Sequence, residues 1–279
     1  MTWYDELHRL GAASTHQLVA AGATPRALTA AVRAGTLIRV RKGRYAPRGT
    51  PAPVLAALRA GARLTCVSAA RSYGLWGGMD ARTHLLVPKH AGRSAEEPGQ
   101  VRHWGEAEHG EIWRVSLADC LRSVVRCADE ETAVAVLDTA ISAGLTTPRR
   151  LPIAFLREPA RSRSIAARAR PGSDSGVESI LRQRLTCRGH LVEQQVAVAG
   201  VGRVDARVDG VLFIEVDGYR YHSGRDAFER DRVRDLGMAL AGGRRLRFPA
   251  SLVLSDPDGV VAAIEAVLAR EDVTLGNAG

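Results

Sequence analysis

The hydrophobic and polar pattern of the last third of the chain predicts a regular series of helices and strands. A helix comes first, three strands follow, and a helix, a strand and a closing helix complete the series. Their predicted bounds are 175–188, then 191–198, 202–208 and 211–217, then 225–241, 244–248 and 257–270. The second and third strands meet at Asp209-Gly210, so we expect an antiparallel meander in this region.

The first 48 residues carry the start signals of two short helices. Ser14 or Thr15 is expected to cap the first of them. Thr24-Pro25 then supplies a cap and a proline at the first helical position, so the second helix is predicted over 25–34.

A basic hairpin over 37–46, with its turn at Lys42-Gly43, follows the second helix. Two helices and a hairpin in this order predict a winged helix, whose second helix enters the major groove of DNA and whose hairpin contacts phosphates. The side chains expected to contact DNA are Arg26, Thr29 and Arg33 on the helix and Arg39, Arg41, Lys42 and Arg44 on the hairpin. The alternative is a small helical cap with a solvated, charged hairpin.

The pattern changes after residue 48 and again after residue 150. Residues 52–150 mix strand and helix signals, whereas 151–174 contain three prolines and many arginines and predict a basic linker. The predicted fold class is therefore α+β and multidomain. It has a winged helix over 1–48, a mixed α/β region over 52–150, the linker, and a further domain over 175–272.

The composition favours a nucleic-acid partner. The chain has 279 residues, a formal net charge of +9 and a pI near 10.1, which favours a polyanion such as DNA, with RNA as an open alternative. The four cysteines form no CxxC pair and no histidine has zinc-finger spacing, so buried free thiols in a reducing compartment are expected. No basic, apolar leader opens the chain and no run reaches about 18 apolar residues, so we expect a cytoplasmic protein without a membrane partner. A second copy of the chain, in a homodimer, is the other candidate partner.

Acidic residues end two neighbouring predicted strands. Glu215 and Asp217 are two residues apart and therefore point to the same face of their strand. Asp205 lies on the strand before. Acids at the ends of apolar strands are costly to bury without a cation, so Asp205 and Glu215 are the predicted ligands of Mg²⁺ or Mn²⁺. The alternative is an ion pair, in which Arg203 or Arg207 neutralises either acid.

The turn between these strands decides whether the two acids can meet. A two-residue loop at Asp209-Gly210 would place Asp205 opposite Ile214 and turn Glu215 to the other face. A three-residue loop or a bulge would return both carboxylates to one face, with Gly210 in the left-handed region. We therefore predict one of these two geometries.

An ordered series of motifs in the C-terminal region carries a family resemblance. The motifs are Glu-Val-Asp-Gly at 215–218, His222, Asp231-x-x-Arg234 and Leu246-Arg-Phe248. In this order they resemble the PD-(D/E)XK nucleases, and more closely the branch related to very-short-patch repair endonucleases, over about residues 175–270. The resemblance implies a restriction-endonuclease-like αβββαβ fold and a Mg²⁺-dependent endonuclease that hydrolyses the phosphodiester bonds of DNA.

The resemblance also assigns roles to two residues beside the acids. Asp217 stands where many family members have lysine. It is a third ligand, an orienter of water, or a residue that starts the turn at Gly218. His222 is either a general acid or base, because its ordinary pKa lies near neutrality, or a surface histidine.

Further positions match the family away from the ends of these strands. Glu178 is either the acid of the family's first helix or the second half of a capping box with Ser175. Gln195 either matches a site position on the first strand or faces solvent. Asp231 and Arg234 are three apart on a predicted helix, where they either support the active site or pair with each other.

The N-terminal regions resemble a second family. The matching positions are Gly11, Gln17-Leu18, Gly22 and Gly43-x-Tyr45, then Ser68, Gly74-Leu75, Thr83–Pro88, Ser116–Asp119 and Ala133–Asp138. They resemble abortive-infection (type IV) antitoxins, and this resemblance assigns no catalytic residue. His84, His103, His109 and Asp119 are accordingly expected to be structural. Two functions follow as expectations: a DNA-binding endonuclease or, alternatively, an antitoxin-like transcriptional regulator with an inactive nuclease fold.

Overall fold

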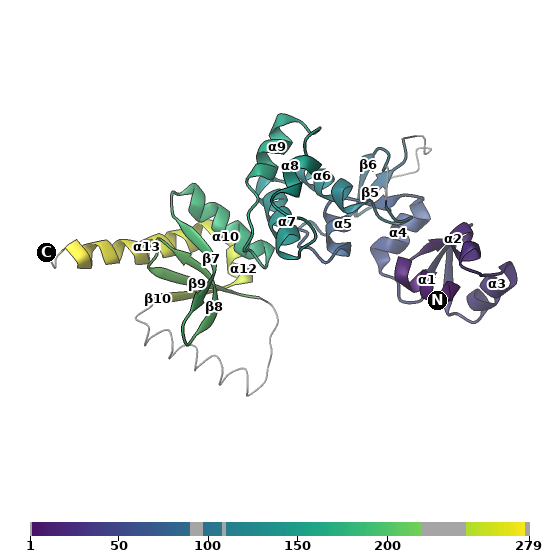
Figure 1. The fold of residues 1–279 in the computed structure, drawn as a ribbon, viewed down its shortest axis with the longest axis horizontal. Helices are drawn as coiled ribbons and strands as arrows, with labels where there is room; N and C mark the ends of the chain where they lie inside the picture. Colours follow the sequence, from purple (N-terminus) through teal and green to yellow (C-terminus); the bar gives the residue numbers. More distant parts are fainter. Residues whose placement is uncertain (1, 90–96, 108–109, 219–243, 277–279) are drawn as a thin grey trace. The chain divides into compact units, whose positions relative to one another are not determined.

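The computed structural model describes residues 2–89, 97–107, 110–218 and 244–276 (Figure 1). The chain divides into two compact units. Unit 1 comprises residues 1–129 and 152–164, and unit 2 comprises residues 130–151 and 165–279. The protein is thus an α+β protein with more than one folded unit, as predicted.

The N-terminal part of unit 1 combines three helices with a small antiparallel sheet of strand order β1-β3-β2. In chain order its elements are α1 (Trp3–Leu10), β1 (Ala13–Ser14), α2 (Thr15–Ala20), α3 (Pro25–Arg33), β2 (Leu37–Arg41) and β3 (Arg44–Pro47). Ser14 and Thr24 cap α2 and α3 as predicted. Leu7, Leu18 and Leu28 from the three helices pack into one core, so the hairpin β2–β3 is held against a fixed helical base.

The rest of unit 1 surrounds a second sheet of strand order β4-β5-β6. Its elements are α4 (Ala52–Ala60), β4 (Arg63–Leu64), α5 (Cys66–Ser72), β5 (Thr83–Val87), β6 (Gln100–Trp104) and α6 (Leu117–Cys127). β5 pairs antiparallel with β4 and parallel with β6. Helix α5 packs against both α6 and β5. Trp113 Nε1 donates to the carbonyl of Leu10 at 2.7 Å, which ties this part to the N-terminal helices.

The segment 151–174, expected to be a basic linker, is largely folded. It carries most of α8 (Arg150–Ala154) and all of α9 (Ala160–Ala167), and it buries Leu151, Phe155 and Ile165. Two of its prolines lie where helices accept them, inside the short α8 and immediately before α9. Proline and arginine content therefore misled the sequence argument here, because the few apolar residues are enough to anchor the segment.

Unit 2 contains a four-stranded sheet of order β10-β9-β8-β7. The described elements are α7 (Glu130–Ser142), α10 (Gly176–Cys187), β7 (Val192–Val198), β8 (Gly202–Val208), β9 (Leu212–Asp217), β10 (Arg244–Pro249), α12 (Ala250–Ser255) and α13 (Pro257–Gly276). β7, β8 and β9 form an antiparallel meander, and β10 runs parallel to β9. These elements agree with the predicted series, whereas the helix predicted over 225–241 lies outside the described residues.

One face of this sheet forms the core of unit 2. Leu212 and Ile214 of β9 pack with Leu181 of α10 and with Val253 and Ile264 of the last two helices. Strand residues alternate between the two faces of a sheet, so Phe213 and Glu215 of β9 lie on the face opposite Leu212 and Ile214. The candidate acidic site is therefore on the side of the sheet opposite the main helical layer.

Among the described residues, no helix combines the length and apolar character needed to cross a bilayer.

Candidate functional site

The hairpin loop between β8 and β9 contains three residues. Val208 pairs with Leu212, which leaves residues 209–211 as the loop, and Asp209 and Gly210 have φ values of 51° and 77°. The prediction of a three-residue loop with Gly210 in the left-handed region is confirmed. Ala206 pairs with Ile214, so Asp205 and Glu215 are the next residues along the two strands. Continuing that register by one position would set them opposite each other on one face of the sheet.

Both acids are held in place by neighbouring groups. Asp205 Oδ2 accepts a hydrogen bond from the backbone N–H of Val216 at 2.8 Å. Glu215 is only 6% exposed, and its Oε2 lies 3.0 Å from Arg245 Nη1 and 3.5 Å from Arg247 Nε. The carboxylates that we expected to bind a metal are thus surrounded by protein donors.

The ion-pair alternative applies to Glu215 with different arginines from those expected. Arg203 contacts Asp174 at 2.6 Å and Arg207 contacts Glu193 at 2.7 Å. Two cations beside Glu215, Arg245 and Arg247, come from β10. The sequence signal for this ion pair was the spacing of Arg245 and Arg247 in β10, the strand parallel to β9. Residues two apart on a strand share a face and can contact the same neighbour.

Asp217 shares a cation with Glu215. Arg247 Nη2 lies 2.8 Å from Asp217 Oδ1, and its Nε faces Glu215. Asp217 is exposed at the end of β9, directly before Gly218. Arg247 therefore bridges the two acids that are two residues apart.

Glu178 and Gln195 meet, although they are on different elements. Gln195 Nε2 donates to Glu178 Oε2 at 3.1 Å, and the backbone N–H of Asp174 donates to the same oxygen at 2.9 Å. Ser175 caps the helix by accepting from Glu178 N at 3.2 Å, which is the first half of the expected capping box. In the second half of a capping box, the Glu178 carboxylate would accept from the backbone N–H of Ser175. Here it accepts from the N–H of Asp174.

The carboxyl of Glu178 also interacts electrostatically with Asp205. Burial, and to a lesser degree the negative charge of Asp205, raise the pKa of Glu178. Glu178 therefore interacts with both Gln195 and Asp205, and Asp205 binds the backbone N–H of Val216, the residue after Glu215. Asp217 is exposed at the end of β9, and His222, Asp231 and Arg234 lie outside the described residues.

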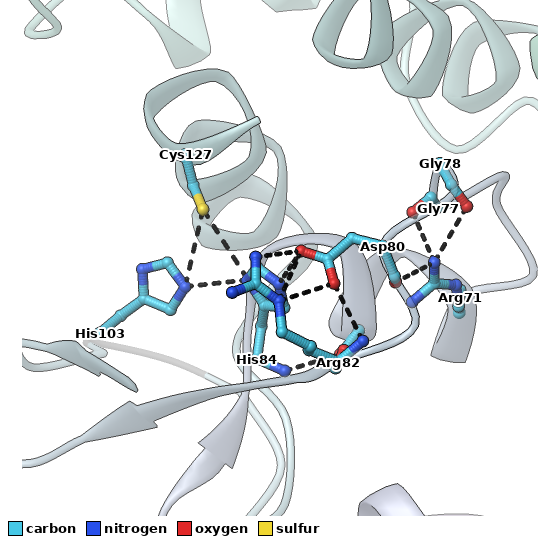
Figure 2. Close-up of polar contacts among 9 residues, drawn as sticks. Arg71, Gly77, Gly78, Asp80, Arg82, His84, His103 and Cys127 are labelled. Carbon is cyan, nitrogen blue, oxygen red and sulfur yellow. Dashed lines mark hydrogen bonds and ion pairs between the residues drawn. The ribbon is translucent and has the colours of Figure 1, made fainter. Parts of the chain in front are cut away.

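A second group of side chains gathers closely enough to hold a metal ion, and it lies in unit 1. Figure 2 shows three of its members, His84, His103 and Cys127. Cys66, His84, His103 and Cys127 each offer one possible ligand atom, and these atoms all lie within 4.8 Å of one another. Within the described part of the chain, no acidic group meets the same criterion. A metal-binding capacity is thus present, but its donors are nitrogen and sulfur.

The four residues of this Cys/His cluster come from four elements. His84 is on β5 and His103 on β6, and the parallel register sets Leu86 beside His103, so the two histidines share a face. Cys66 is the first residue of α5, where its φ of 50° is unusual for a residue with a side chain. Cys127 is the last residue of α6.

Hydrogen bonds connect the cluster internally. His84 Nδ1 lies 3.1 Å from His103 Nε2, and Cys127 Sγ lies 3.8 Å and 3.9 Å from these two nitrogens. Hydrogen bonds with Cys66, His103 and His84 lower the pKa of the Cys127 thiol well below its ordinary value. In the same pair, the hydrogen bond with Cys127 and burial raise the pKa of Cys66.

One expectation about the cysteines is corrected. Only two of the four are buried, Cys66 and Cys120, whereas Cys127 and Cys187 are exposed. The structural role expected for His84 and His103 stays a prediction. The four thiols are free, as expected. Sequence spacing held no clear signal, because the four ligands lie far apart along the chain without any short ligand pair. The hydroxyl of Ser116 accepts from the backbone N–H of Asp119 and donates to its carboxylate at the start of α6, which fits the structural role expected for Asp119. His109 lies outside the described residues.

The candidate DNA-contacting residues lie on the surface of the N-terminal region. Arg26, Thr29 and Arg33 are exposed on α3, although the Thr29 hydroxyl donates to the carbonyl of Pro25 at 2.9 Å. On the hairpin, Arg39, Arg41 and Lys42 are exposed and Arg44 is half-buried. Burial and the nearby charges of Arg41 and Arg63 lower the pKa of Arg44, which indicates a concentrated positive charge at this edge.

A comparison with protein-family models finds no match for the chain, and a comparison with curated proteins finds none either.

Proposed function

We propose that the chain is a DNA-binding, metal-dependent endonuclease that hydrolyses phosphodiester bonds. The observation that carries this proposal is that Asp205 accepts a hydrogen bond from the N–H next to Glu215 on the adjacent strand, and that Glu178, bound to Gln195, interacts with Asp205. A three-residue loop produces this arrangement where a two-residue loop would have prevented it.

The donor set at the acids fits a hard divalent cation. Carboxylate oxygens are the ligands that Mg²⁺ and Mn²⁺ prefer, and Mg²⁺ needs only one or two of them from protein. Asp205 and Glu215 would hold the ion, with Asp217 next to them. A divalent ion bound there would lower the pKa of a water molecule and stabilise negative charge on phosphorus-bound oxygens.

The chain's own residues supply the rest of the chemistry. Arg245 and Arg247 lie on the acidic side of the sheet, where a guanidinium can bind phosphate oxygens with two parallel hydrogen bonds. Glu178 keeps a proton to higher pH than an ordinary glutamate and can return it to an oxygen that develops negative charge. His222 is retained as a candidate acid or base.

DNA binding is assigned to α3 and the β2–β3 hairpin. In a winged helix the exposed face of α3, with Arg26 and Arg33, would enter the major groove, and Arg41 and Lys42 would contact phosphates. In this proposal the N-terminal region binds DNA, and the acidic site cleaves it.

A second candidate function is an antitoxin-like transcriptional regulator whose nuclease site is inactive. One observation favours it: Arg245 and Arg247 already contact Glu215, and a guanidinium at that carboxylate competes with a metal ion. Such a protein would bind DNA with its N-terminal region and leave it intact.

A plasmid-nicking assay in Mg²⁺ or Mn²⁺ separates the two functions. The variants are Asp205→Ala and Glu215→Ala, and the matched control is Glu193→Ala, an acid on the same sheet that pairs with Arg207. We expect both site variants to lose cleavage while DNA binding, measured separately, is retained, and the control to cut normally. Wild-type protein that binds DNA but never cuts it supports the regulator, and cutting that survives both site substitutions rejects the acidic site.

A further inference from the structure

We propose that Cys66, His84, His103 and Cys127 bind a single Zn²⁺ ion that stabilises unit 1. The two histidine nitrogens lie 3.1 Å apart, and the sulfur of Cys127 lies 3.8 Å and 3.9 Å from them. A tetrahedral zinc with bonds of about 2.0–2.3 Å sets its ligand atoms roughly 3.3–3.8 Å apart. The cluster therefore needs only small side-chain adjustments to enclose the ion.

The kind of donor selects the metal. Two thiolates and two imidazoles match zinc, whereas Mg²⁺ and Ca²⁺ require oxygen ligands. A two-iron cluster with two cysteines and two histidines binds each pair to a different iron, but here all four donors lie within 4.8 Å of one another. One ion at the centre is the arrangement that this spacing allows.

The site has no vacant ligand position. Four protein donors complete a tetrahedron, and a catalytic zinc usually keeps one position for water or substrate. The role of the ion is therefore structural. It would join the start of α5, the end of α6 and the two parallel strands β5 and β6. The sheet that contains these strands is small: β5 pairs with β6 over five positions and with β4 over two.

The residues around the cluster support this assignment (Figure 2). Asp80 Oδ2 lies 3.1 Å from His84 Nε2 and is itself held by Arg82 at 2.7 Å. A carboxylate on the far nitrogen of a zinc-binding histidine fixes its tautomer and directs the other nitrogen to the metal. His84 Nδ1, on the side that faces the cluster, is thereby left as the lone-pair donor.

The backbone near Cys66 and His84 is equally fixed. The N–H of Thr65 donates to the carbonyl of His84 at 3.0 Å, and the N–H of His84 donates to Ser68 Oγ at 2.8 Å. These bonds hold Cys66 next to β5 in its positive-φ conformation. Such strain persists where the surroundings determine the geometry, and it is concentrated at sites with a function.

Metal analysis of the full-length protein tests the proposal. Cys127→Ser removes an exposed ligand at the last residue of α6, and Cys187→Ser removes an exposed cysteine at the last residue of α10, which makes it a matched control. We expect about one zinc per chain in the wild type and in Cys187→Ser, and less than about 0.2 in Cys127→Ser. Equal zinc in both variants, another metal in place of zinc, or a wild type that stays zinc-free after reconstitution overturns the proposal.

Two further measurements keep the test decisive if a variant folds poorly. Wild-type protein loaded with Co²⁺ should show the visible absorption of a tetrahedral, thiolate-bound ion, and His103→Asn should alter it while Cys120→Ser leaves it unchanged. Removing zinc from the wild type with a chelator should lower its Tm by at least about 4 °C, and added Zn²⁺ should restore it. A chelator that leaves the Tm unchanged contradicts a structural ion. None of these readouts depends on DNA cleavage.

Discussion

The side-chain amide of Gln195 donates a hydrogen bond to Glu178 at 3.1 Å and so joins the middle of β7 to the first turn of α10. Gln195 makes this contact from a backbone conformation with φ of 53°, which residues with side chains rarely adopt. The contact thus connects a strained strand position with an acid whose pKa is raised, and each property can be tested by itself.

The strain at Gln195 predicts an inverted preference for glycine. Gln195→Ala and Gln195→Gly lose the same hydrogen bond, but alanine keeps the left-handed backbone strain whereas glycine does not. Although glycine normally weakens a strand, we expect the glycine variant to be more stable than the alanine variant by about 1 kcal/mol. Urea denaturation of both variants measures the difference, and an alanine variant that is equally stable would contradict it.

The raised pKa of Glu178 predicts a pH-dependent effect on stability. The folded state binds this proton more tightly than the unfolded chain, where the ordinary value is 4.5. The favourable contribution is therefore complete below that value and is lost as the pH rises through the folded-state pKa. We expect Glu178→Gln, compared with wild type, to be relatively more stable at about pH 7 than at about pH 4. Unfolding curves at both pH values test the sign, and the opposite trend would reject the assigned cause.

Metal binding at the acidic site predicts ligand-dependent stability without any assay of cleavage. A ligand that binds only the folded state at a hundredfold excess over its Kd adds about 2.7 kcal/mol to the free energy of unfolding. Mg²⁺ should therefore raise the Tm of the wild type and of Glu193→Gln, but not that of Glu215→Gln. An equal rise in all three proteins would point to non-specific binding.

Buried Asp138 in unit 2 predicts a large loss of stability on truncation. It accepts hydrogen bonds from Ser179 at 2.7 Å, Arg182 at 2.8 Å and the backbone N–H of Arg170 at 2.7 Å. Asp138→Ala leaves the buried cation of Arg182 without its partner, so we expect a loss of about 3–5 kcal/mol. Glu130→Ala, in the exposed pair with Arg168, should cost less than about 1 kcal/mol. If chemical denaturation gave similar losses of stability for Asp138→Ala and Glu130→Ala, the predicted contribution of Asp138 would be wrong.

DNA binding by the hairpin predicts a change in salt dependence. Arg41→Ala should lower the slope of log K against log salt by about one for each lost phosphate contact. Arg59→Ala, an exposed arginine on α4, should leave the slope unchanged. Titrations at several salt concentrations measure both, and equal slopes for all proteins would remove the hairpin from the DNA interface.

Local sequence signals predicted much of the fold. Thr24-Pro25 located the start of α3, and the chain around Asp209-Gly210 located the β8–β9 hairpin, because caps and turns depend on a few adjacent residues. The segment after residue 150 was different. Its helices are held by buried Leu151, Phe155 and Ile165, and such anchoring depends on tertiary contacts that composition does not report.

The candidate sites divide in the same way. Asp205 and Glu215 could be found because each is an acid in a predicted strand with apolar residues, and the length of the loop between the strands could be inferred from its turn residues. The Cys/His cluster could not be found, because its ligands come from α5, β5, β6 and α6. Only the pairing of β5 with β6 brings His84 and His103 together, and no spacing rule describes that.

The three-residue loop at 209–211 has a consequence for how this protein can change over time. Deleting one residue there would shift β9 against β8 by one position and exchange the two faces of the strand. Every acid would still be present in the gene, yet Asp205 would stand opposite Ile214. A single codon lost from this surface loop would thus dismantle the acidic site without the substitution of any acid.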